Sequence, residues 1–210
     1  EKITKRERIK GFANFRISDR LKELGSLKFS ESVKKSHRKR IENPRTEIVN
    51  WKGNTISKNP IHLVPQNTLD ELLKVKSFIQ SKGKAQARSD AERYDNGMLD
   101  KFEYICSNIG LEFNREYFRE LKNEMGDFMI SEKYRWNIPR PYQVAEFMNI
   151  PFGERYITKS TVSPTYPSSH AGSANLIAEV LSKIYPNHSD RFFRLANLIS
   201  LSRISAGVHF

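Results

Sequence analysis

Residues 167–209 read PSSHAGSANLIAEVLSKIYPNHSDRFFRLANLISLSRISAGVH and contain two stretches in which apolar residues recur at helical spacing. The spacing predicts one helix over residues 169–184 and a second over residues 189–205. Pro186 separates them, because proline lacks the amide hydrogen that would continue the first helix. This part of the chain is therefore expected to form two consecutive helices with a short connection.

Helix signals continue upstream of these two helices. Two capping boxes, in which side chains satisfy the first free backbone amides of a helix, predict helix starts. They are formed by Thr68 with Glu71 and by Ser89 with Glu92. A third helix is expected from Asn114 toward Lys133, after a helix stop at Gly110. Since there is almost no alternating strand pattern and no internal repeat, the sequence predicts an all-α helical bundle.

Length and composition indicate a soluble globular protein. The 210 residues can bury a sizeable core, and 38% of them are apolar while 29% are charged. We expect one helical domain over residues 61–210, with a basic N-terminal arm or extension over residues 1–60. The single cysteine, Cys106, excludes an intrachain disulfide and is expected to pack as a small hydrophobe.

Positive charge is concentrated in the N-terminal segment. Residues 1–60 hold 17 of the 36 Lys and Arg residues and 7 of the 24 Asp and Glu residues, a net charge of +10. Residues 61–210 carry only +2. Few aromatic residues are interleaved with these charges, so a solvated or partner-docking arm with one or two short helices is the preferred interpretation. Nucleic acid stays open as a partner of this arm.

No apolar run reaches the roughly 18 residues that a bilayer span requires, so we expect no transmembrane segment. A soluble, cytoplasmic protein is the favoured expectation. The chain begins with Glu1 rather than Met, which leaves a removed signal peptide as the other possibility. The sequence carries no signal of oligomeric state.

Three ordered motifs in the last third of the chain supply what phosphoryl transfer requires. They are Lys133 with Arg140-Pro141, then Pro167-Ser168-Ser169-His170, then Ser202-Arg203 with His209. The lysine and the arginines provide positive charge for phosphate oxygens. One imidazole can donate a proton to a leaving group and the other can attack phosphorus.

The serines of the second motif stand where a proline-rich loop turns into a helix. Backbone amides and the positive end of the helix dipole would face an anion bound there. An ordinary helix cap explains Ser168 and Ser169 equally well. His170 in the first turn adds to the functional interpretation, because a cation there requires an anionic ligand that compensates the dipole.

The spacing within these motifs resembles that of a known superfamily. Residues 133–141 fit K-x6-R-P, residues 167–170 fit P-S-G-H with one departure, and residues 202–209 fit S-R-x5-H. Together they are similar to the signature that unites type-2 phosphatidic acid phosphatases, bacterial non-specific acid phosphatases and vanadium haloperoxidases. The resemblance covers residues 115–210 and implies a helical bundle of the acid phosphatase/haloperoxidase type.

The resemblance also implies a role for each matching residue. His209 would be the nucleophile that takes the phosphoryl group, and His170 the general acid that protonates the leaving oxygen. The phosphate would be bound by Lys133, Arg140, Ser168, the backbone amide of Ser169, and Arg203.

Two features depart from the family pattern. Ser169 stands where the family has glycine, and its side chain either crowds the phosphate or adds a hydrogen bond. The pattern also continues beyond the second histidine to an aspartate that orients it, whereas this sequence ends one residue after His209. We therefore expect a fragment that is inactive as given.

The predicted function is a metal-independent phosphatase that hydrolyses phosphomonoesters through a phosphohistidine. Its expected partner is a phosphorylated small molecule or a lipid headgroup. A haloperoxidase with vanadate as cofactor is the enzymatic alternative, and a nucleic-acid-binding protein acting through the basic arm is the non-enzymatic one. No metal site is expected, because close ligand spacing is absent among the five histidines, His37, His62, His170, His188 and His209.

Overall fold

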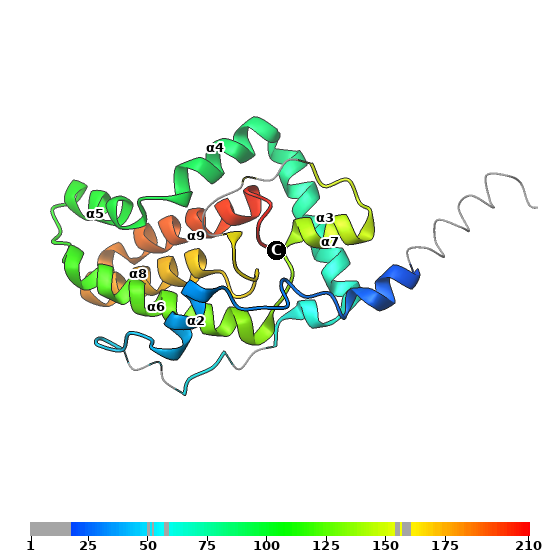
Figure 1. The fold of residues 1–210 in the computed structure, drawn as a ribbon. Helices are drawn as coiled ribbons and strands as arrows, with labels where there is room; N and C mark the ends of the chain where they lie inside the picture. Colours follow the sequence, from blue (N-terminus) through cyan, green and yellow to red (C-terminus); the bar gives the residue numbers. More distant parts are fainter. Residues whose placement is uncertain (1–17, 50, 52, 57–58, 154–155, 157–160) are drawn as a thin grey trace, which may run out of the picture.

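The computed structural model describes residues 18–49, 51, 53–56, 59–153, 156 and 161–210. Within these ranges the regular structure is helical and no strand is present, which confirms the all-α prediction. The helices are α2 (Lys35–Glu42), α3 (Pro65–Lys82), α4 (Lys84–Asp95), α5 (Met98–Asn108), α6 (Arg115–Trp136), α7 (Pro141–Met148), α8 (Ser169–Ile184) and α9 (Ser189–Ser205), with short 3-10 helices η1 (Ile61–Leu63) and η3 (Pro186–His188) (Figure 1). Residues 18–24 are also helical.

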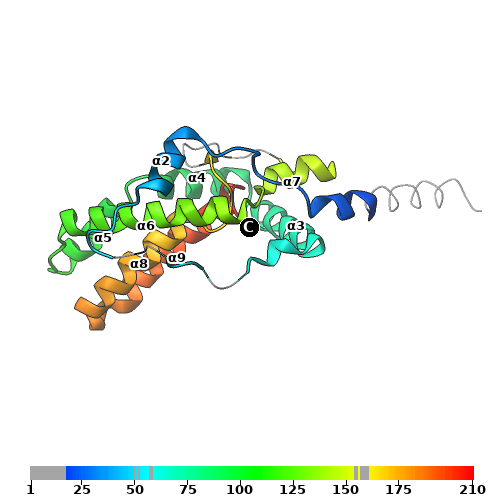
Figure 2. The same ribbon diagram turned by 60° about the horizontal axis from the view of Figure 1, so that its bottom comes forward.

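Helices α8 and α9 lie side by side at the centre of the bundle (Figure 1, Figure 2). Helix α6 packs against α8, while α4 and α5 pack against α9. The small side chains of Ala174 and Ala178 are fully buried and let the helix backbones approach closely. Complete burial of a larger side chain such as Phe102 or Phe192 stabilises the fold by about 1.5–3 kcal/mol each. The central core therefore unites helices from the second half of the chain.

The ends of three helices agree with the sequence. Helices α8 and α9 have the predicted bounds, and α6 begins after Asn114, whose side chain accepts a hydrogen bond from the amide of Tyr117. Gly110 follows α5 with a left-handed backbone at φ +69°, as expected of a helix stop. These elements confirm that strong apolar periodicity with a cap locates a helix well.

Both predicted capping boxes are wrong as helix starts. Thr68 lies inside α3, which starts at Pro65 because proline is already set for the first helical position. The hydroxyl of Thr68 donates to the carbonyl of His62 instead. Ser89 lies in the middle of α4, which begins after Gly83 at φ +77°. A proline and a glycine, rather than hydroxyl caps, start these two helices.

A second, smaller core joins distant parts of the chain. Helix α7 was not among the expected helices; Pro141 occupies its first helical position, which suits proline. The buried residues of this core come from residues 18–24, α3 and α7, and they are Leu24, Leu72, Val144, Ala145 and Met148. Phe210 packs against them, so the last residues of the chain lie inside the molecule.

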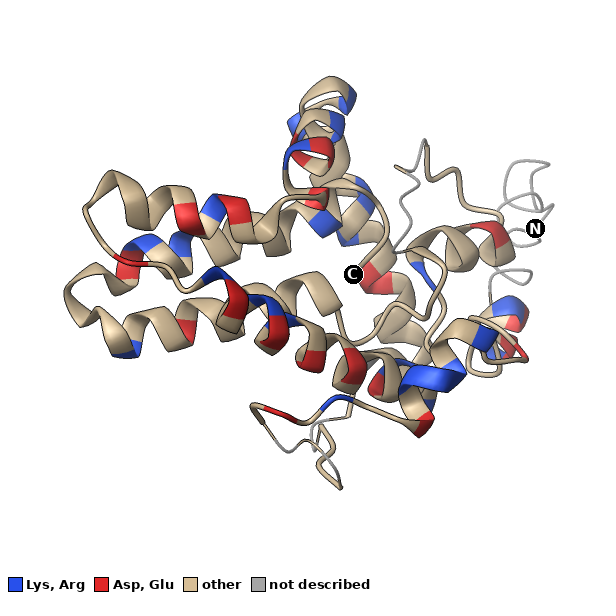
Figure 3. Cartoon of the chain, turned by 60° about the vertical axis from the view of Figure 1, so that its left-hand side comes forward, with Lys and Arg blue, Asp and Glu red and all other residues tan. Residues whose placement is uncertain are grey.

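Helix α2 and the described residues that follow it up to residue 56 pack along α6. Three carboxylates on α6 are buried, Glu124, Asp127 and Glu132, and acidic residues form a row of red bands along this helix (Figure 3). Glu124 accepts the backbone amides of Ile48 and Val49 at 2.6 and 2.8 Å. Glu132 accepts the amide of Ile56 at 3.0 Å. Residues 1–17 lie outside the described residues, and the domain boundary expected at residue 60 stays a prediction.

In the described ranges, no helix combines the length and the apolar character needed to cross a bilayer. This finding agrees with the expected absence of a transmembrane segment. The short helices expected in the N-terminal arm are present as residues 18–24 and α2.

Candidate active site

A cavity of about 210 Å³ lies where α2, α6 and the first turn of α8 meet the loop after α9. Four of the seven residues expected at a phosphate site line it, namely Lys133, Ser169, His170 and His209. The other three, Ser168, Arg140 and Arg203, are not part of its wall as described. The two imidazoles that the sequence placed at one site therefore face the same cavity.

Lys133 brings a buried positive charge from α6 to this cavity. Its side chain is 3% exposed, and its Nζ donates to the carbonyl oxygens of Pro164 at 2.6 Å and Thr165 at 3.3 Å. Burial lowers the pKa of Lys133 well below its usual value, and the positive charges of Arg140 and Arg203 lower it further. A bound anion would relieve this repulsion.

Arg140 stands behind the cavity wall and joins two loops. It is fully buried, its Nε donates to the carbonyl of Ser163 at 2.9 Å, and its Nη1 donates to that of Val208 at 2.6 Å. The same Nη1 lies 3.4 Å from Nε2 of His209. Burial lowers the pKa of Arg140 to about 10, and Arg203 adds to the effect. Arg140 therefore both fixes the loop that carries His209 and supplies charge beside its ring.

Arg203, on the last turn of α9, pairs with a residue that the sequence did not reveal. Its Nη1 donates to Oδ1 of Asp95 at 2.7 Å, and the guanidinium is 1% exposed. Asp95 is the last residue of α4, far away in the sequence. No motif marks it, although a carboxylate at a helix C-terminus opposes the helix dipole and is therefore unusual. Asp95 fixes the orientation of Arg203 beside the site.

His170 is held by the same residue, through its backbone. Its Nε2 lies 3.0 Å from the carbonyl oxygen of Asp95, and a carbonyl oxygen only accepts, so Nε2 carries a hydrogen. The other ring nitrogen, Nδ1, must then carry the proton that a general acid would donate. Burial, followed by the charge of Arg203, lowers the pKa of His170 to about 4, although the contacts with Asp95 oppose the change. His170 is therefore neutral at pH 7.

His209 has a tautomer that the surrounding hydrogen bonds define. The hydroxyl of Thr165 donates to the carbonyl of Val208 at 3.2 Å, so its oxygen is left to accept from Nδ1 of His209 at 3.3 Å. Nε2, which faces the guanidinium of Arg140, keeps its lone pair. Burial, with the charges of Arg140 and Lys133, lowers the pKa of His209 well below its usual value. This is a neutral imidazole whose lone pair is on Nε2, beside the guanidinium of Arg140.

Thr165 is the second functional residue that the sequence did not reveal. It occupies the position of an orienting group for His209, the role in which an aspartate beyond the second histidine was expected. Nothing in its sequence context separates it from other loop threonines. Its role follows from the tertiary contact alone.

The two serines at the start of α8 differ in their placement. Ser168 is the N-cap, and its Oγ accepts the amide of Ala171 at 3.4 Å. Ser169, at the usual glycine position, lies on the cavity wall. The structure thus gives Ser168 an ordinary capping contact and turns Ser169 toward the space in which an anion would sit.

Charge is unbalanced in this part of the molecule. Lys133, Arg140 and Arg203 shift the pKa of one another or of His209, which places the three cations close together. Asp95 pairs with Arg203. Buried cations at close range repel one another more strongly than they would in water. A bound anion would relieve this repulsion.

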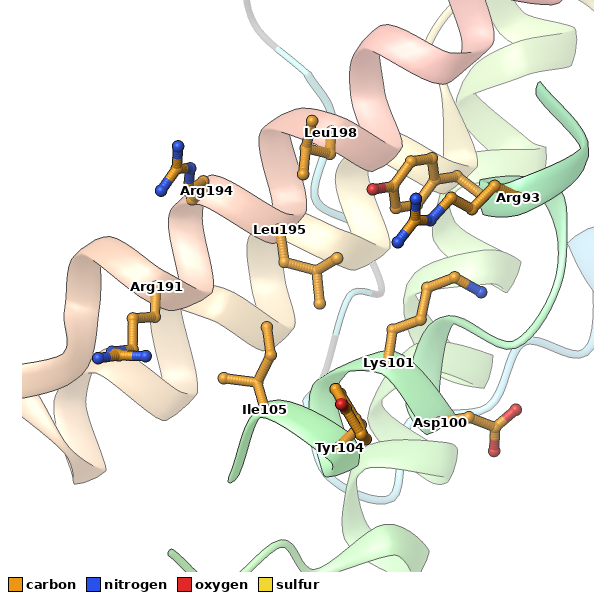
Figure 4. Close-up of a pocket in the computed structure, with 10 residues that line it drawn as sticks. Arg93, Asp100, Lys101, Tyr104, Ile105, Arg191, Arg194, Leu195 and Leu198 are labelled. Atoms are coloured by element: carbon orange, nitrogen blue, oxygen red, sulfur yellow. The ribbon is translucent and has the colours of Figure 1, made fainter. Parts of the chain in front are cut away.

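A larger pocket of about 550 Å³ lies elsewhere, between the end of α4, α5 and α9 (Figure 4). Leu195 and Ile105 approach each other across it, and Arg191 and Arg194 point outward from α9 (Figure 4). Its described lining residues include no histidine, cysteine or serine. It contains none of the residues of the three phosphate motifs and is therefore not the candidate active site.

No group of three or more His, Cys, Asp or Glu side chains in the described ranges is arranged to hold a metal ion. The expectation of a metal-free site stays a prediction. Comparison with protein-family models and with curated proteins finds no match to this chain.

Proposed function

We propose that this protein is a phosphatase of the superfamily that its three motifs resemble. The observation that carries the proposal is one cavity lined by the imidazoles of His170 and His209 and by a buried lysine, with two buried arginines behind its wall; His37 also lines this cavity. These groups come from α6, α8, α9, the N-cap of α7 and the loop that follows α9. The proposed fold is correspondingly the acid phosphatase/haloperoxidase type of helical bundle.

The proposed reaction has two steps. Nε2 of His209 forms a bond to phosphorus while the bond from phosphorus to the leaving oxygen breaks. His170, protonated when the substrate dianion is bound, gives its proton to that leaving oxygen. Water then attacks the phosphohistidine and releases inorganic phosphate, with neutral His170 accepting the proton of the water. Each ring returns to its starting state.

The cations supply the electrostatic part of catalysis. Charge on the phosphoryl oxygens increases toward the transition state, and Lys133, Arg140 and Arg203 are already held in place by carbonyl and carboxylate acceptors. Because they are desolvated, they interact with an anion more strongly than the same groups would in water. The expected substrate is a phosphorylated small molecule or a lipid headgroup.

Hydrolysis of a chromogenic phosphomonoester tests this proposal. The full-length protein is expected to release inorganic phosphate without added metal, and His209→Ala is expected to abolish turnover. His170→Ala should retain formation of a phosphohistidine from an activated aryl ester, whose leaving group needs little protonation. Full turnover by the His209 variant, or no hydrolysis by the full-length protein, would reject the phosphatase.

Vanadate discriminates between the two enzymatic interpretations. Because vanadate imitates the pentacoordinate phosphoryl transition state, the same residues would hold it. Inhibition of phosphate release by vanadate supports the phosphatase. Halogenation of an organic acceptor in vanadate, peroxide and halide, without phosphatase activity, would support the haloperoxidase instead.

Nucleic-acid binding through the N-terminal segment stays the non-enzymatic alternative. In the described part of that segment, Arg40 and Arg45 both bond to Asp127 on α6 rather than extending from the molecule. A salt-sensitive shift in oligonucleotide mobility would support this alternative. Unchanged mobility at low salt would exclude it.

A further inference from the structure

A second cavity adjoins the candidate active site. Its volume is about 390 Å³, and it shares Arg40, Gly126, Ser169 and His170 with the wall of the first cavity. Its other lining residues include four with polar side chains, Arg45, Lys122, Asn123 and Ser173. A molecule whose phosphate occupies the first cavity would therefore extend directly into the second.

The second cavity is strongly positive. Arg40 and Arg45 share a single carboxylate, since Nε of Arg40 lies 2.6 Å from Oδ1 of Asp127 and Nε of Arg45 lies 2.9 Å from Oδ2. Lys122 forms no ion pair with a carboxylate of the described residues. Burial lowers its pKa, and the nearby charges of Arg45 and Arg40 lower it further. Three cations are thus accompanied by one anion.

Gly126 makes room for one of these cations. Glycine within a helix costs about 1 kcal/mol relative to alanine, so its presence in the middle of α6 calls for a reason. A Cβ at this position would lie 2.9 Å from Nη2 of Arg40. Gly126 therefore lets the guanidinium lie against the helix backbone, on the wall that the two cavities share.

We propose that the second cavity binds a second phosphate group of the substrate, so that small molecules carrying two phosphates are preferred over those carrying one. This inference rests on the proposed function for the assignment of the first phosphate. Guanidinium groups bind phosphate oxygens through paired hydrogen bonds, and a lysine adds a point charge. A neutral leaving group would use none of these three cations.

The preference can be measured with 1,3-propanediol bisphosphate and 3-hydroxypropyl phosphate, which differ only in the second phosphate. After correction for its two equivalent phosphates, we expect kcat/KM to be about tenfold higher for the bisphosphate. This is the ratio expected when one additional charge-assisted hydrogen bond forms. Lys122→Met should remove most of this ratio. The control Lys183→Met removes the same charge from the far end of α8, where Lys183 is 75% exposed, and should preserve the ratio.

Gly126→Ala provides a second variant that is expected to fold. Alanine favours the helix, yet its methyl group would displace Arg40. The ratio should therefore fall, while Arg45 still pairs with Asp127 and the variant remains folded. An unchanged ratio in both Lys122→Met and Gly126→Ala would overturn the inference, as would equal kcat/KM for the two compounds in the unmodified protein.

Failure of the phosphatase proposal gives a different result. If neither compound is hydrolysed, titration calorimetry with the same two compounds compares their affinities without chemistry. If the bisphosphate binds more tightly, and Lys122→Met weakens its binding about tenfold, the result would support the second phosphate site. Equal affinities would reject it.

Discussion

Replacement of Lys133 by methionine is expected to make the unliganded protein more stable and to weaken its binding of phosphate. Lys133 is buried next to two arginines, and its pKa is lowered by burial and by their charges. Methionine retains the length of the side chain, so little cavity forms. A residue that opposes folding in this way is expected to be required for ligand binding.

The magnitude follows from two opposing contributions. Removing a buried ammonium relieves several kcal/mol of desolvation, here taken as about 4 kcal/mol. The carbonyls of Pro164 and Thr165 lose their donor, which costs about 2 kcal/mol. The net gain of about 2 kcal/mol corresponds to a melting temperature higher by about 4–8 °C for a domain of this size.

The lowered pKa also defines the pH dependence. The pKa of Lys133 is lower in the folded state than its ordinary value of 10.5. The free-energy cost of burying its positive charge is therefore fully present below the folded-state pKa. This cost disappears as the pH rises to 10.5. The difference in stability between Lys133→Met and the unmodified protein should therefore shrink at high pH.

Thermal unfolding with and without inorganic phosphate is the assay. At a phosphate concentration of 100 times Kd, the free energy of unfolding of the unmodified protein should increase by about 2.7 kcal/mol. Loss of one buried charge contact should weaken phosphate binding by Lys133→Met about thirtyfold. Lys183→Met should behave like the unmodified protein. A Lys133→Met variant that melts lower and is still fully stabilised by phosphate would refute the reasoning.

Three further predictions concern the other side chains of the site. Thr165→Val should lower kcat about tenfold or more with little change in KM, because Nδ1 of His209 loses its acceptor. Thr165→Ser should keep the kcat of the unmodified protein. A valine variant with the same kcat as the unmodified protein would contradict this role. Asp95→Asn should lower the melting temperature by about 6–12 °C, because breaking a buried ion pair costs about 3 kcal/mol of unfolding free energy. Added sulfate should recover part of this loss. A loss of unfolding free energy below about 1 kcal/mol would show that Asp95 does not hold Arg203 in place. Sulfate, whose charge is constant in this range, should bind more tightly as the pH falls from neutral toward about 4, since a bound anion raises the lowered pKa of His170. Titration calorimetry should show a weaker pH dependence of sulfate affinity in His170→Gln. The same pH dependence in both proteins would contradict the assignment of this effect to His170.

The bundle could be predicted where local signals were strong. Helices α8 and α9 have apolar residues at regular spacing, a serine cap and a separating proline, so their bounds followed directly from the sequence. The starts of α3 and α4 did not, because Pro65 and Gly83 override nearby hydroxyl residues that only look like caps. Local signals compete, and the backbone preferences of proline and glycine prevailed.

The residues of the candidate site could likewise be predicted only where a local sequence signal marks them. His170, Arg203 and His209 could be named because they stand at fixed spacings beside helix ends. Asp95 and Thr165 could not, because they reach the site through tertiary contacts that no spacing encodes. The docking of the N-terminal segment on α6 had a partial signal, since Glu124, Asp127 and Glu132 place carboxylates on a face that also carries Leu121.

The central claim is that two imidazoles and three cations bind one phosphoryl group, and a crystal structure with vanadate tests it most directly. The account predicts vanadium within bonding distance of Nε2 of His209, an apical oxygen facing His170, and the other oxygens contacted by Lys133, Arg140 and Arg203. Vanadate bound outside the cavity that His170 and His209 line, or no bound vanadate at a saturating concentration, would contradict it.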